Sequence, residues 1–109
     1  MSALLFVAQR LSAVLLAAAG ALHLATILYV ERSGLTAGDV LARTHGNAWL
    51  FAFYALFVIA VAIHAPIGLR TVLREWTSWR GIALDVAMVA VAALLLALGL
   101  RAVVAVFVA

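Results

Sequence analysis

Few ionisable side chains lie within the apolar stretches of this chain, and His64 is one of them. It lies near the end of a long apolar run, and Gly68 and Arg70 follow it. An ionisable ring is costly in lipid, so such a residue is a candidate functional site. On a helix, positions 64 and 68 lie one above the other, so a glycine leaves the surface beside the imidazole flat. We therefore predict that His64 is an axial ligand of haem, with room for the porphyrin at Gly68.

A second histidine, His23, lies in the first apolar run. Ala19 and Gly20 precede it by about one turn and Ser12 by close to three turns, so small residues again share one side of a helix with an imidazole. This repetition predicts a second haem ligand. The alternative for both histidines is a hydrogen bond between packed helices, because polar side chains also hold membrane helices together. The third histidine, His45, is expected to be solvated in a loop or to relay protons.

The composition predicts an integral membrane protein with no sizeable soluble domain. Of its 109 residues, 70% are hydrophobic and 10% are charged, and the mean hydropathy is +1.30. A soluble domain of this size does not need so much apolar surface. The 7 basic residues are all arginine and are not clustered on a soluble face, so nucleic acid is not an expected partner. Without cysteine, the chain could hold haem iron only through histidine or methionine.

Three apolar runs are long enough to cross a membrane, because a helical span needs about 20 residues. They cover residues 4–30, 48–70 and 82–108. The predicted fold class is therefore all-α, with three transmembrane helices. We expect one membrane-anchor domain over residues 1–109, packed in a helical bundle with a second membrane subunit or a second copy of the chain.

The loops between the spans carry two further expectations. Thr36 and Asp39 have the spacing of an N-terminal capping box, which predicts a short surface helix over residues 39–43. Asp85 follows an arginine-rich loop and is expected to meet Arg80 or water. The N-terminus and that loop lie on one side of the membrane and hold four arginines against three on the other, which favours the cytoplasm for this side.

The H-x-x-x-G-x-R pattern that starts at His64 resembles the second-helix haem motif of the cytochrome b membrane-anchor subunits of succinate dehydrogenase and fumarate reductase. The run Q-R-L-S-A over residues 9–13 is similar to the Arg-x-Ser-Gly start of the first helix in that family, with Ala13 where glycine is usual. The two motifs occur in the family's order, and the match covers roughly residues 5–80.

This resemblance implies a non-catalytic electron-transfer subunit of the respiratory chain, which binds haem b and passes electrons between an iron–sulfur subunit and menaquinone or ubiquinone. One or two haems would be shared with a partner chain. The flavoprotein and iron–sulfur subunits would dock on the cytoplasmic face of a bacterial inner membrane, where the N-terminus would also lie. The implied cofactor-binding residues are His64, His23, Gly68 and Arg70, with both histidines on iron, and the implied quinone-binding residues are Arg10 and Ser12.

Depth along the helices separates the two candidate ligands. If Arg10 and Arg70 both mark the inner surface, the helical rise places His23 about 20 Å and His64 about 9 Å from it, a difference of about 11 Å. Each haem would then need a second histidine from another membrane chain. The competing interpretation is a haem-free structural anchor of a flavoprotein or of another membrane complex. A small transporter fits less well, because it would require an acidic residue deep in a span and Asp85 lies near an interface.

Overall fold

The computed structural model describes residues 2–109, and its regular elements are four helices. Three of them are long and apolar enough to cross a membrane, which confirms the predicted all-α class and the three apolar spans. Two of the three extend beyond the predicted ranges, which ended at residues 30 and 70. The helices are α1 (Ala3–Ser33), α2 (Ala37–Thr44), α3 (Ala48–Trp76) and α4 (Ile82–Val108).

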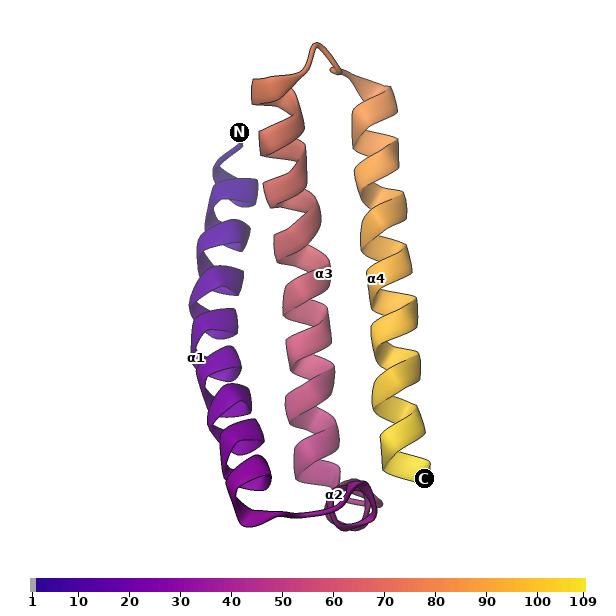
Figure 1. Cartoon of the computed structure of the whole chain (residues 1–109). Helices are drawn as coiled ribbons and strands as arrows, with labels where there is room; N and C mark the ends of the chain where they lie inside the picture. The colour runs from indigo at the N-terminus through magenta and orange to yellow at the C-terminus, as the bar shows by residue number, and fades with distance from the viewer. Residues whose placement is uncertain (1) are drawn as a thin grey trace.

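The three long helices lie side by side with α3 in the middle (Figure 1). The main packing contacts join α1 to α3 and α3 to α4. The N-terminus lies at the same end as the α3–α4 loop, and the C-terminus lies at the α2 end (Figure 1). The molecule is 49 Å long, against a bilayer of about 40–45 Å with its headgroup regions. The arrangement therefore suits a chain that crosses the membrane three times.

The ends of α1 and α2 follow from local sequence signals. Gly34 takes the left-handed conformation with φ 68°, and the Leu35 N–H donates to the Val30 carbonyl at 3.3 Å, which closes the last turn of α1. At the start of α2, the Thr36 hydroxyl oxygen accepts the Asp39 N–H at 3.2 Å, and the Asp39 carboxylate accepts the Thr36 N–H at 2.9 Å. This capping box confirms the predicted surface helix.

The short helix α2 is joined to the C-terminal end of α4. The Gly46 N–H donates to the Phe107 carbonyl at 2.8 Å, and the Thr44 hydroxyl donates to the Val106 carbonyl at 3.4 Å. The rings of Phe51 and Phe107 meet edge to face with centroids 5.0 Å apart. These contacts hold α2 across the end of the bundle that lies opposite the α3–α4 loop.

A glycine sets the close packing of α3 on α4. A Cβ atom added at Gly99 would lie 2.5 Å from Cγ1 of Val58, too close for any real contact. The buried residues of α4 are Leu84, Met88 and Val103. On α3, the helix continues through Pro66, whose ring is buried and whose missing N–H leaves one helical carbonyl without its usual donor.

One loop expectation is wrong. Asp85 does not meet Arg80, because the Arg70 Nε–H donates to its carboxylate at 2.8 Å, and the carboxylate stays half exposed. Arg80 donates instead to the carbonyls of Thr77 and Trp79 at 2.7 and 3.0 Å. The reason is geometric: Arg70 projects from α3 at the height where α4 begins, whereas the loop carbonyls are the acceptors nearest to Arg80.

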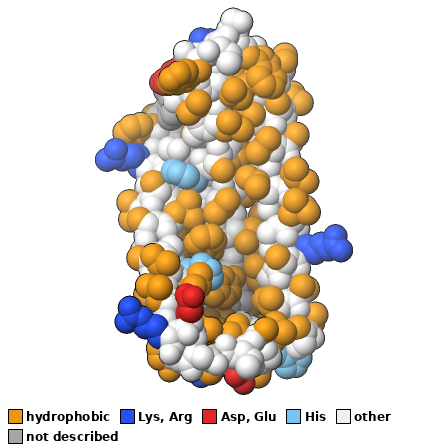
Figure 2. All heavy atoms as spheres, in the orientation of Figure 1, with side chains coloured by type: hydrophobic (Ala, Val, Ile, Leu, Met, Phe, Trp, Pro, Cys, Tyr) orange, Lys and Arg blue, Asp and Glu red, His pale blue; other side chains and the backbone are white. Residues whose placement is uncertain are grey.

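The surface of the molecule is largely apolar. Figure 2 shows hydrophobic side chains over the whole height of one face, interrupted by few charged groups. Large side chains are open to the surroundings along all three long helices, with Trp49 at 88% exposure and Trp76 at 82% near the two ends of α3. A monomer in water does not present so much contiguous apolar surface, so lipid or further helices must cover it.

Candidate functional site

Two histidine–hydroxyl pairs link α1 to α3. His64 Nδ1 on α3 lies 3.4 Å from the Ser12 hydroxyl oxygen on α1. His23 Nδ1 on α1 lies 3.3 Å from the Tyr54 hydroxyl oxygen on α3. Both imidazoles are half-buried in the single chain, and Figure 2 shows histidine side chains reaching one face at separate heights. Each ring is therefore held at Nδ1 from the neighbouring helix.

The direction of the Ser12–His64 hydrogen bond follows from the number of protons available. Ser12 is buried at 6% exposure, and its hydroxyl donates to the Gln9 carbonyl at 3.1 Å. A serine hydroxyl carries one hydrogen, and with that hydrogen on the Gln9 carbonyl the oxygen is an acceptor for a ring N–H of His64. In the tautomer with the proton on Nδ1, His64 donates to this oxygen and Nε2 keeps its lone pair. That is the tautomer in which Nε2 can bind a metal.

Two aromatic side chains of α3 pack against His23. The ring of Tyr54 meets it edge-on, with centroids 5.4 Å apart and planes at 85°, and the ring of Phe57 lies 6.2 Å away. These contacts fix the plane of the imidazole. Sequence inspection missed Tyr54 because nothing in a single chain reveals which residue of α3 faces His23.

The two pairs define two levels along the helices. Eleven residues separate Ser12 from His23 on α1, and ten separate Tyr54 from His64 on α3. The helical rise converts these counts into about 16 and 15 Å, which agree with each other. The levels are therefore farther apart than the 11 Å expected from sequence, and the two histidines cannot be axial ligands of one iron.

The separation of His23 and His64 estimated from sequence was too small, because Arg10 and Arg70 do not lie at the same height along the bundle. The antiparallel pairing of Ser12 with His64 sets Arg10 opposite residue 66, four residues short of Arg70. Four residues of helix correspond to about 6 Å. Arg70 therefore lies farther toward the membrane surface than Arg10.

Gly68 lies at the contact with α1. A Cβ atom at this position would lie 3.3 Å from Nε2 of Gln9, so the Gln9 amide occupies the space beside the glycine within this chain. The other amide atom, Gln9 Oε1, is buried and has no hydrogen-bond partner among the described residues. One polar contact between α1 and α3 thus includes His64, Ser12 and Gly68. The Gln9 Oε1 atom in this contact is an acceptor without a donor within residues 2–109.

The predicted arginines lie apart from this contact. Arg70 is paired with Asp85, and the Arg10 guanidinium lies 5.7 Å from the centre of the Phe6 ring on an exposed side of α1. Arg10 and Ser12 are two residues apart, which places them on nearly opposite sides of the helix. The structure does not bring them together in one pocket. His45 is exposed where α2 ends.

The donor set fits axial ligation of haem. A protein can hold haem iron through a single histidine or through a pair of ligands, and an imidazole suits either arrangement. The described residues contain no group of three or more metal-ligating side chains, and each imidazole would act as a single axial donor. Comparisons with protein-family models, curated proteins and solved structures found no match to this chain.

Proposed function

We propose that this chain is a haem b-binding membrane anchor that passes electrons between a soluble flavin and iron–sulfur partner and a membrane quinone. The observation that carries the proposal is the chain of contacts from the Gln9 carbonyl through Ser12 to His64, which engages Nδ1 and leaves Nε2 without a hydrogen-bond partner among the described residues. A bound haem supplies one-electron transfer. The protein supplies an oriented imidazole, because a ring held at Nδ1 is fixed in tautomer and direction.

A partner chain completes each site in this proposal. Bis-histidine ligation needs two imidazoles per iron, and His23 and His64 lie at different levels. A second copy related by a two-fold axis along the membrane normal would place His64 opposite His64 and His23 opposite His23, and closed symmetry of this kind is the commonest. A related membrane subunit would serve equally. The open apolar surface supports either partner.

The resemblance to succinate dehydrogenase and fumarate reductase anchors gives the remaining roles. The motif would assign Gly68 and Arg70 to the haem site, where the Gln9 amide would have to move aside from Gly68. The flavoprotein and iron–sulfur subunits would dock at the end that holds the N-terminus and the α3–α4 loop. That end would face the cytoplasm of a bacterial cell. The quinone would bind near Arg10, whose exposed guanidinium can donate to a carbonyl, while Ser12 is already engaged with His64.

A haem-free structural anchor is the second candidate. It is favoured by the fact that both histidines already join α1 to α3 by hydrogen bonds, as polar side chains do between membrane helices. In that case His64 and His23 would contribute to helix packing alone.

A visible difference spectrum, reduced minus oxidised, distinguishes the two candidates in the purified membrane complex. We expect His64→Ala to remove a haem b band while the chain still inserts, because insertion depends on the apolar spans. His45→Ala is the matched control and should leave the spectrum unchanged, since His45 lies exposed beyond α2. Absence of a haem band from the wild-type complex would favour the structural anchor.

A further inference from the structure

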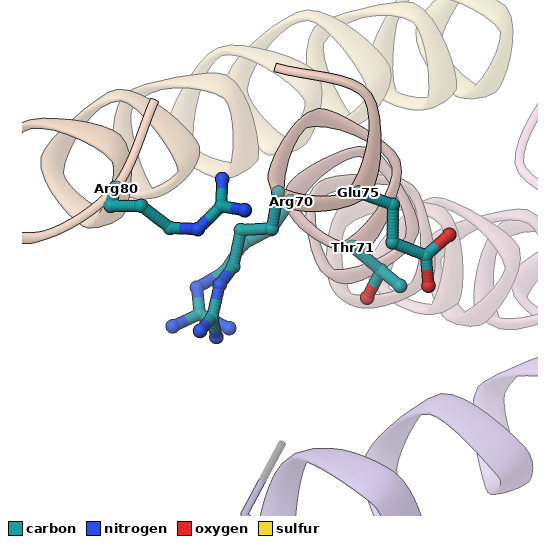
Figure 3. Close-up of a pocket in the computed structure, with 5 residues that line it drawn as sticks. Arg70, Thr71, Glu75 and Arg80 are labelled. Atoms are coloured by element: carbon teal, nitrogen blue, oxygen red, sulfur yellow. The ribbon is translucent and has the colours of Figure 1, made fainter. Parts of the chain in front are cut away.

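Three arginines gather where α3 meets the α3–α4 loop. They line a cavity of about 450 Å³ together with Thr71 and Glu75. Figure 3 shows Arg80 reaching from the loop toward Arg70, while Glu75 extends on another side of α3. Positive groups thus outnumber the carboxylates here, even with Asp85 included. The three arginines are Arg70, Arg74 and Arg80.

These guanidinium groups keep donors free. The Arg70 Nε–H donates to the Asp85 carboxylate, and one terminal nitrogen of Arg80 donates to the two loop carbonyls. Their remaining N–H groups, and those of Arg74, donate to no protein acceptor in the described part of the chain. The contacts already made hold Arg70 and Arg80 in place, so the free donors face a prepared anion site.

An apolar groove continues from this cavity toward the middle of the membrane. It has a volume of about 520 Å³ and lies between α1, α3 and α4, with Arg70 and Asp85 at its polar end. Arg70 lines both the cavity and the groove. Trp76 and Trp79 lie at this end of the molecule, as expected of residues at the headgroup level. The apolar walls include Leu4, Ala8, Ile63, Pro66, Met88 and Ala92.

We propose that the arginine cavity and the adjoining groove bind one anionic phospholipid, with the phosphate on the guanidinium groups and an acyl chain in the groove. Guanidinium groups bind phosphate oxygens through paired N–H donors, and basic pockets between membrane helices are typical sites for anionic headgroups. A zwitterionic headgroup carries a cation beside its phosphate, which the three arginines would repel, so an anionic headgroup is the better match for this cavity. This proposal does not depend on haem.

The headgroup part is tested by titrating the purified complex with phosphatidylglycerol or phosphatidylcholine and counting retained lipids by native mass spectrometry. We expect the wild type to prefer phosphatidylglycerol and the double variant Arg74→Gln/Arg80→Gln to lose roughly tenfold of that affinity. Arg70 stays unchanged because it belongs to the proposed haem site. The control, Arg32→Gln/Arg101→Gln, removes the same charge elsewhere and should retain the preference.

Three further variants test the groove and guard against misfolding. Ala92→Leu narrows the groove and should weaken phosphatidylglycerol binding, whereas Ala93→Leu on the exposed side should not. Arg74→Lys/Arg80→Lys keeps the charge and should keep the preference. The proposal would be overturned if the wild type retained both lipids equally, or if both glutamine variants lost the same affinity. It would also be overturned if glycerol 3-phosphate, which has no acyl chain, bound as tightly as phosphatidylglycerol.

Discussion

Ser12 has a different role at the residue scale from the one its sequence context suggested. Its position beside Arg10 resembles a quinone-binding pair, yet its hydroxyl is buried between the Gln9 carbonyl and His64. A hydrogen bond at Nδ1 raises the basicity of an imidazole ligand and fixes its orientation. Ser12 is therefore better placed to tune His64 than to meet a quinone directly.

We predict that Ser12→Ala weakens haem retention roughly tenfold and raises the midpoint potential of the haem held by His64. The potential should rise because a less basic imidazole stabilises ferric iron less well. Redox titration of the haem band is the measurement. Ser33→Ala is a matched control, since Ser33 makes the same kind of hydrogen bond within α1 but contacts no histidine. Loss of quinone-linked turnover with an unchanged potential would instead support the quinone role.

The packing of α3 on α4 can be tested at the scale of the element. Gly99→Ala places a methyl group against the stiff, β-branched side chain of Val58, and such overpacking costs about 1–3 kcal/mol. Gly20→Ala should be neutral or slightly stabilising, because nothing lies within 4 Å of the added atom. Denaturant unfolding followed by helical circular dichroism measures both. If the double variant Gly99→Ala/Val58→Ala regains the free energy of unfolding, the clash is the cause. An unchanged free energy of unfolding in Gly99→Ala would contradict the close packing of Gly99 on Val58.

The cap of α2 predicts a dependence on pH. Hydrogen bonds from the Thr36 backbone and hydroxyl, and then the charge of Arg43, hold the pKa of Asp39 below its ordinary value. Because the folded pKa is the lower one, the stabilisation is present above the unfolded pKa and is lost as the pH falls through the folded pKa. The Thr36 amide resonance should follow this titration by NMR, and Asp39→Asn should abolish the pH dependence. A titration unaffected by Asp39→Asn would rule out this cap as the source.

The sequence predicted features that depend on neighbouring residues and missed those that depend on register between helices. Apolar length located the spans, and the spacing of Thr36 and Asp39 located α2. The Tyr54–His23 pair and the Gly99–Val58 contact require knowing how two helices are shifted and rotated against each other. The partner of Asp85 was missed for the same reason.

At the scale of the whole molecule, much of the bundle surface is open to lipid or to further helices. Helix α3 packs against both neighbours, whereas the outer sides of α1 and α4 stay largely exposed. The histidines at two levels also lack opposing ligands within the chain. A second membrane chain would meet both needs.

The most direct test is the haem b content of the intact membrane complex, measured together with its chain stoichiometry. We expect low-spin haem with two imidazole ligands, accompanied by a second copy of the chain or another membrane subunit. For two copies with both levels filled, the ratio is one haem per chain. Absence of haem would contradict haem binding, and full haem in a complex with one copy and no other membrane subunit would contradict shared ligation.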